Sequence, residues 1–148
     1  MADVDITAEL RDAGLRVTAQ RAAVLAVLRE HRGHLAVDQI VEQVRARLHA
    51  VSAQAVYNAL AALTEAELVR RIEPAGSPAL FEARAGDNHH HIVCRRCGAV
   101  GDVDCVTGSA PCLDPSNAGG FLVDEAEVTF WGLCPACQKK SNKRARSA

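Results

Sequence analysis

A chain of 148 residues with a hydrophobic content of 49% is long enough for one domain or two small ones with ordinary globular packing. Only 3% of the residues are aromatic, so we expect a zinc site and a dimer interface to stabilise a core built from Ala, Val and Leu. No apolar run is long enough to span a bilayer, and the chain starts without an apolar signal segment. These features argue against a membrane partner and predict a cytoplasmic location.

The formal net charge of -1 gives no overall indication of nucleic-acid binding, but the charges are unevenly distributed. No acidic residue occurs from Gln43 to Thr64, and arginines outnumber carboxylates between residues 11 and 32. The local field decides which face of a protein meets phosphate, so the first third of the chain is the candidate face.

Apolar residues recur with helical spacing along the first half of the chain. A short amphipathic turn runs from Leu10 to Leu15, and Thr18 is placed to cap the helix that follows it. Residues 40–48 predict a second helix, and Ser52 is placed to cap a third. The outward face of this third helix carries small or hydrogen-bonding residues, namely Ala53, Gln54, Tyr57 and Asn58. A plain solvated face would carry Lys and Glu, so this face suits a helix that enters a major groove.

Two strand-like runs, residues 68–73 and 79–82, follow the third helix and are joined by a segment bounded by Pro74 and Pro78. They predict a hairpin. Three helices followed by a hairpin is the winged-helix arrangement, which favours DNA binding. A small helical bundle with an unrelated hairpin is the alternative.

The stretch from Glu82 to Cys97 is dense in metal ligands. In a strand, alternate side chains share a face, so His89 and His91 would point one way and His90 the other. A solvated loop without a partner is the alternative for this histidine run. A second metal held by imidazole and carboxylate groups would be iron, manganese, nickel or zinc.

Two pairs of cysteines are spaced C-x-x-C, Cys94 with Cys97 and Cys134 with Cys137. Together they supply the four thiolates of a closed tetrahedral zinc site, and paired disulfides are the alternative in an oxidising compartment.

The chain between the two cysteine pairs predicts strands and one loop. Asp102 and Asp104 alternate with valines, and a later run continues the sheet: Val123, Val128, Phe130, Trp131 and Gly132. Between them, residues 105–120 are rich in Gly, Pro and Ser and predict an irregular loop. Its Cys105 and Cys112 are candidates for a thiol switch or an extra metal ligand, with inert thiols as the alternative. The basic tail, residues 139–148, is expected to be disordered.

Three runs resemble the ferric uptake regulator (Fur) family of metal-dependent repressors, and its catalase-linked branch most: residues 14–21, 52–60 and 89–98. The resemblance covers residues from about 9 to 138 in one order. It implies an α/β (α+β) protein with a winged-helix domain at residues 1–83, a dimerisation and metal-binding domain at 84–138, and the tail beyond. It also implies a homodimer that binds double-stranded DNA with an AT-rich inverted repeat when its regulatory metal is present.

Carried onto this chain, the resemblance implies that Tyr57 contacts thymine and that Arg16 reaches toward a minor groove. The remaining candidates for DNA contact share its reading helix or the basic segment before it: Arg21, Ser52, Gln54 and Asn58. The family commonly has arginine where Asn58 stands and glycine where Glu67 stands. A phosphate contact would then be missing or moved, and the helix stop must form without glycine.

The resemblance also implies the ligands of the regulatory metal, which are His34, Glu82, His89, His91 and Asp102. It suggests Fe²⁺ there, with Mn²⁺, Zn²⁺ or Ni²⁺ as alternatives, and structural Zn²⁺ on the four cysteines. Peroxide sensors of the family typically place two aspartates at the carboxylate positions, where this chain pairs Glu82 with Asp102. Iron sensing without peroxide chemistry therefore stays open.

The sequence thus predicts a non-enzymatic repressor that responds to iron or peroxide and controls catalase-peroxidase, oxidative-stress or iron-homeostasis genes. A zinc or nickel uptake regulator is the alternative within the family. A zinc-dependent hydrolase or a constitutive zinc-ribbon adaptor are the alternatives outside it.

Overall fold

A computed structural model describes residues 5–83, 89–104, 115–124 and 126–146, the side chains only as far as residue 141. The chain divides into two units, Met1–Asp87 and Asn88–Ala148. Among the described residues, no helix combines the length and the apolar character needed to cross a membrane.

The first unit begins with four helices: α1 Ile6–Asp12, α2 Ala19–His31, α3 Val37–Leu48 and α4 Ala53–Glu65. Side-chain oxygens cap three of them, as Thr18 accepts from the N–H of Arg21 and Ser52 from that of Ala55, while Asp5 caps α1. The caps at Thr18 and Ser52 confirm the predicted starts of α2 and α4. The predicted turn from Leu10 to Leu15 belongs to α1 and its C-terminal end, which Gly14 follows with a φ of 74°.

The core of this unit is aliphatic, and its largest fully buried side chains come from all four helices and the adjoining strand: Leu10, Val24, Leu25, Leu28, Leu35, Ile40, Leu60 and Leu63. Apolar positions on one face of each helix supply this core, as the helical periodicity predicts. Phe81 joins it from the sheet.

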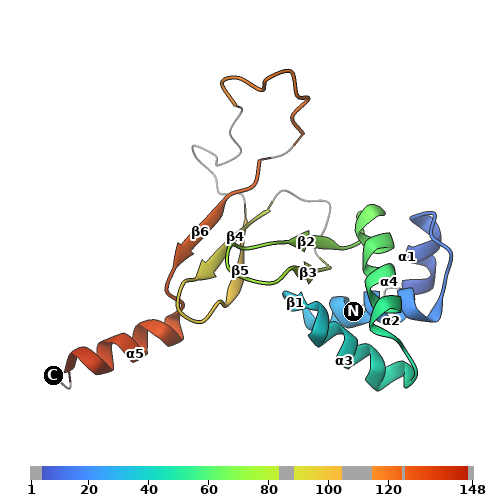
Figure 1. Cartoon of the computed structure of the whole chain (residues 1–148), viewed down its shortest axis with the longest axis horizontal. Helices are drawn as coiled ribbons and strands as arrows, with labels where there is room; N and C mark the ends of the chain where they lie inside the picture. The colour runs from blue at the N-terminus through green and yellow to red at the C-terminus, as the bar shows by residue number, and fades with distance from the viewer. Residues whose placement is uncertain (1–4, 84–88, 105–114, 125, 147–148) are drawn as a thin grey trace. The chain divides into compact units, whose positions relative to one another are not determined.

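A small antiparallel sheet completes the unit, with strands β1 Leu35–Ala36, β2 Arg70–Ile72 and β3 Leu80–Glu82 in the order β1-β3-β2. The β2–β3 hairpin follows α4 directly (Figure 1), so the predicted winged-helix arrangement is confirmed. Glu67 has a φ of 58° where the chain leaves α4, so this residue adopts the left-handed conformation without glycine. Strand β1 is not predicted by any pattern in the sequence.

The second unit is a three-stranded sheet followed by a helix. Strands β4 His89–Cys94, β5 Val100–Asp104 and β6 Thr129–Gly132 lie in the order β5-β4-β6, and α5 runs from Pro135 to Arg146. β5 pairs with β4 antiparallel, as expected, whereas β6 pairs with it parallel.

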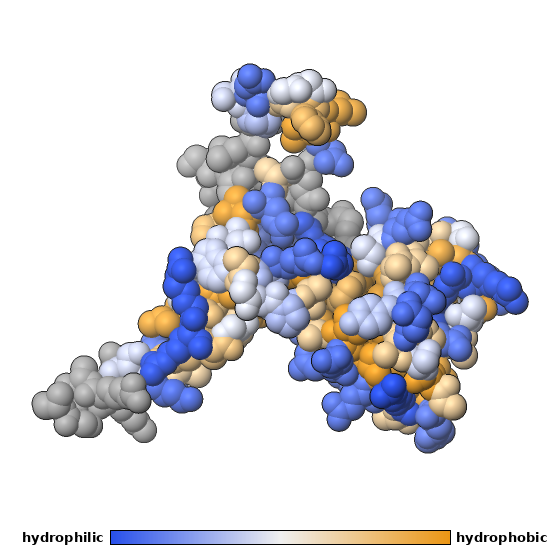
Figure 2. Space-filling model, in the orientation of Figure 1, coloured by the Kyte–Doolittle hydropathy of each residue, from blue (hydrophilic) through white to orange (hydrophobic). Residues whose placement is uncertain are grey.

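Two expectations for the second unit differ from the structure. The basic tail continues as helix α5 to Arg146, where we expected disorder. Val123 and Val128 were expected in the sheet but lie outside β6, Val123 in the segment of residues 115–124 and Val128 directly before the strand. Phe121, Leu122 and Val123 expose 81%, 98% and 47% of their surface, and the segment shows apolar surface in Figure 2.

Replacing Ser52 with Ala is expected to lower the free energy of unfolding by about 1 kcal/mol, because an N–H at the start of α4 loses its acceptor. Urea denaturation of the full chain measures the difference. Ser52→Thr keeps a hydroxyl at the cap and serves as the matched control. An alanine variant as stable as the threonine variant would show that the cap contributes nothing.

Candidate metal centres and nucleic-acid interface

The four paired cysteines converge within the second unit. Cys94 ends β4, Cys97 lies in the turn that follows it, and Cys134 and Cys137 lie at the start of α5. All four are free thiols, each with its sulfur within 4.8 Å of the others, and the Cys97 and Cys134 sulfurs are 3.7 Å apart. Four soft thiolate donors at such separations fit tetrahedral zinc.

Backbone contacts hold the first cysteine pair in a tight turn. The N–H of Gly98 donates to the carbonyl of Cys94 at 2.9 Å, and Gly98 has a φ of 76°. Arg95 donates from its backbone to Gly132 of β6 at 2.8 Å, and Arg96 donates from its side chain to Ser141 of α5 at 2.9 Å. The turn is thus tied to both elements that flank the second pair, which places the two cysteine pairs side by side.

Two of the four cysteines have pKa values shifted in opposite directions. Backbone N–H groups of Cys134 and Cys97 lower the pKa of Cys94 to about 6, whereas burial, together with the neighbouring thiols, raises the pKa of Cys137 to about 12. A metal binds the thiolate form, so loading this set releases protons.

The first unit contributes an imidazole and a carboxylate. His34 directly precedes β1, and Glu82 ends β3, the strand that pairs with β1 through Leu35 and Phe81. This register brings His34 Nε2 to 2.8 Å from Glu82 Oε2, and both side chains are buried. Nitrogen and oxygen donors of this kind suit a divalent first-row metal.

The second unit contributes two imidazoles and a carboxylate. His91 lies opposite Asp102 in the β4–β5 register. Asp102 Oδ1 is 3.8 Å from His89 Nε2 and 3.7 Å from His91 Nε2, and the two rings lie 4.9 Å apart. As predicted from strand alternation, His89 and His91 share one face of β4, and Nε2 of each ring faces Asp102. This set also fits a divalent ion.

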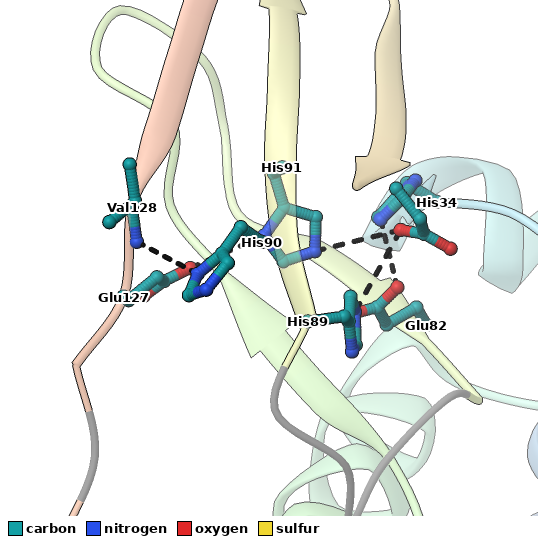
Figure 3. Close-up of polar contacts among 8 residues, drawn as sticks. His34, Glu82, His89, His90, His91, Glu127 and Val128 are labelled. Atoms are coloured by element: carbon teal, nitrogen blue, oxygen red, sulfur yellow. Dashed lines mark hydrogen bonds and ion pairs between the residues drawn. The ribbon is translucent and has the colours of Figure 1, made fainter. Parts of the chain in front are cut away.

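His90 takes the opposite face of β4, as expected. Its Nδ1 accepts a hydrogen bond from the backbone N–H of Val128 at 3.1 Å, and the side chain is fully buried (Figure 3). This histidine therefore anchors the chain entering β6.

Glu127 is a further residue at this site that the sequence did not predict. Its Oε1 lies 3.3 Å from Nδ1 of His91, on the ring nitrogen opposite to the one that faces Asp102. The parallel pairing of β6 with β4 brings Glu127 there, and no local pattern around residue 127 indicates that pairing.

The outward face of α4 has the predicted exposure. Tyr57 exposes 50% of its surface, and Gln54 donates from its amide to Asn58 at 3.0 Å. A hollow of about 230 Å³ lies between the start of α2 and this face, lined by Thr18, Gln20, Arg21, Ala55, Asn58 and Ala59. Arg21 donates to the backbone carbonyl of Arg16 at 2.8 Å, which fixes one cation beside the hollow. The helix and hollow suit a nucleic-acid backbone.

Cys105 and Cys112 lie outside the described residues, so their proposed redox or ligand roles stay predictions.

Residues 12–109 match the Ferric uptake regulator family. The Transcriptional regulator FurA of Mycobacterium tuberculosis is 54% identical over 141 residues, which is 95% of each chain. The chain belongs to the ferric uptake regulator family. Its members are transcriptional regulators rather than enzymes, so this protein is a metal-dependent, DNA-binding transcriptional regulator.

Solved structures confirm the fold of this family member. The ferric uptake regulator of Helicobacter pylori, whose structure is described as revealing three functional metal binding sites, matches with a TM-score of 0.67 and 22% identity over 90% of this chain and 89% of that one. A zinc uptake regulator complexed with zinc and DNA matches with a TM-score of 0.64 and 20% identity over 91% of each chain. Other solved regulators of this fold hold iron or manganese.

Proposed function

We propose that this family member is a homodimeric, cytoplasmic repressor that binds an AT-rich inverted repeat when one Fe²⁺ is held by side chains of both units. The observation that supports this most is the donor chemistry: a buried His34–Glu82 pair in the first unit and His89 and His91 facing Asp102 in the second. Neither set alone supplies the five or six ligands that such an ion commonly takes, and together they do.

A bound divalent ion would supply the positive charge and coordination bonds that hold both sets in one arrangement. His34 and Glu82 lie in the first unit, which carries the proposed DNA-binding helix α4, and the other three ligands lie in the second unit. Arrangements of the two units in which all five side chains bind the ion are favoured over arrangements that separate these ligands. Metal binding would therefore shift the population of the protein toward the first kind. In a two-fold dimer, the distance between the two α4 helices would then match the spacing of the two DNA half-sites.

The four cysteines are proposed to hold structural Zn²⁺: Cys94, Cys97, Cys134 and Cys137. They join the end of β4 to the start of α5, so zinc would stabilise the unit that forms the dimer.

The DNA contacts are assigned to α4 and the segment before α2. Tyr57 is proposed to contact thymine, and Arg16 is proposed to reach a minor groove. Contacts to the DNA backbone are proposed for Arg21, Ser52 and Gln54. Asn58 is held by Gln54, so it offers a hydrogen bond where an arginine would offer charge.

The signal is proposed to be iron or peroxide, with catalase-peroxidase, oxidative-stress or iron-homeostasis genes as targets. Peroxide sensors of the family typically carry aspartate where this chain has Glu82, so iron sensing without peroxide chemistry stays an alternative. A zinc or nickel uptake regulator has the same donor set and is the alternative.

Anaerobic fluorescence anisotropy tests the proposal with zinc-loaded protein and a labelled AT-rich inverted repeat. The protein is titrated separately with Fe²⁺, Mn²⁺, Zn²⁺ and Ni²⁺. At the same limiting concentration, Fe²⁺ is expected to tighten DNA binding most. A scrambled duplex of equal composition is the control. Equal affinity for the repeat with and without every metal would contradict the proposal.

A further inference from the structure

His91 has a carboxylate at each ring nitrogen. Asp102 Oδ1 lies 3.7 Å from Nε2, and Glu127 Oε1 lies 3.3 Å from Nδ1. The imidazole is buried, whereas Glu127 exposes 47% of its side chain. A neutral imidazole carries a proton on one nitrogen and a lone pair on the other, so the group at each nitrogen decides what the ring can bind.

Backbone hydrogen bonds hold Glu127 beside the ring. The N–H of Val128 donates to His90 Nδ1 at 3.1 Å, and the N–H of His91 donates to the carbonyl of Val128 at 3.3 Å. The residue next to Glu127 is therefore bonded to two consecutive residues of β4 (Figure 3). This double attachment fixes the origin of the Glu127 side chain at the Nδ1 edge of His91.

The same bonds assign the proton of His90. A backbone N–H can only donate, so His90 Nδ1 must carry a lone pair, and the proton of the neutral ring is on Nε2. The Nδ1 atoms of these neighbouring histidines therefore lie beside opposite kinds of group. A backbone N–H donor lies at Nδ1 of His90, and a carboxylate acceptor lies at Nδ1 of His91.

We propose that Glu127 is a positioning residue for the regulatory metal ligand His91. Its carboxylate accepts the Nδ1 proton, which leaves the lone pair on Nε2, the nitrogen that faces Asp102 and His89. This inference rests on the proposed regulatory site. Carboxylates that orient a ligating histidine in this way commonly raise metal affinity 10- to 100-fold.

The test uses full-length, zinc-loaded protein with ¹⁵N-labelled histidine, without regulatory metal or DNA. Long-range ¹H–¹⁵N spectra are expected to show His91 protonated on Nδ1 in the wild type and a mixture of both tautomers in Glu127→Ala. Glu127→Gln keeps an acceptor oxygen and is expected to restore the wild-type tautomer in part. Asp124→Asn, which removes an exposed carboxylate from the same segment, is the matched control and should change nothing.

Mn²⁺ affinity, measured by electron paramagnetic resonance with a competing chelator, gives the second readout. Glu127→Ala is expected to weaken Mn²⁺ binding about 10- to 100-fold at unchanged stoichiometry, and Glu127→Gln less. An unchanged His91 tautomer in Glu127→Ala would overturn the proposal, as would an equal loss in Asp124→Asn. A lower Mn²⁺ stoichiometry in the glutamine variant would overturn it too, since Glu127 would then be a ligand itself. Failure of the regulatory site shows differently, as unchanged Mn²⁺ affinity in His91→Ala.

Discussion

Cys97→Ser is expected to lose the structural zinc and the folded sheet unit together. The sulfur of Cys97 lies 3.7 Å from that of Cys134, and removing it leaves three thiols in a set built for four. Metal binding of this kind contributes about 10–16 kcal/mol in small zinc domains, far more than a three-stranded sheet gains from its own packing. Metal analysis with sedimentation equilibrium should therefore show protein without zinc and without dimer.

Ser116→Ala is the control for this prediction, because it changes an exposed residue of the same unit outside the quartet. It should keep one zinc per protomer and the dimer. A Cys97→Ser protein that is still a zinc-loaded dimer would show that the quartet does not stabilise the second unit.

His91→Ala is expected to abolish metal-dependent operator binding. It removes a buried imidazole whose Nε2 faces Asp102 and leaves His89 as the remaining imidazole of that set. Loss of a direct ligand should cost more than the 10- to 100-fold typical of residues behind the ligands, so we expect regulatory-metal affinity to fall more than about 100-fold. Mn²⁺ titration and anisotropy measure both effects.

His31→Ala is the matched control, since His31 is exposed in the last turn of α2. It should keep wild-type metal affinity and DNA binding. The His91→Ala protein must also retain its zinc, which separates loss of a ligand from loss of fold. Metal-activated DNA binding that survives in His91→Ala would remove this histidine from the site.

The features predicted correctly from sequence depend on local geometry. Thr18 and Ser52 were recognised as caps because a hydroxyl at a helix start bonds a backbone N–H three residues on. Strand alternation separated His89 and His91 from His90, and the C-x-x-C spacing joined the cysteines.

The features that were missed depend on contacts between distant segments. Strand β1 has two residues and exists through its pairing with β3, which no local periodicity reveals. Glu127 reaches His91 because β6 runs parallel to β4, and the sequence near residue 127 gives no register. The helix over the basic tail was missed because its charges resemble a disordered end, although lysine and arginine are also good helix formers.

The coupling between metal and DNA tests the central claim, that one ion is held by side chains of both units. Operator affinity is measured with and without Mn²⁺, and Mn²⁺ affinity with and without operator, in the wild type and in His34→Ala. The two ratios must agree by linkage, and we expect about 5- to 150-fold in the wild type. In His34→Ala, which removes a proposed ligand from the first unit, the ratio of operator affinities and the ratio of Mn²⁺ affinities should both fall to about one. Wild-type coupling in His34→Ala would contradict the account.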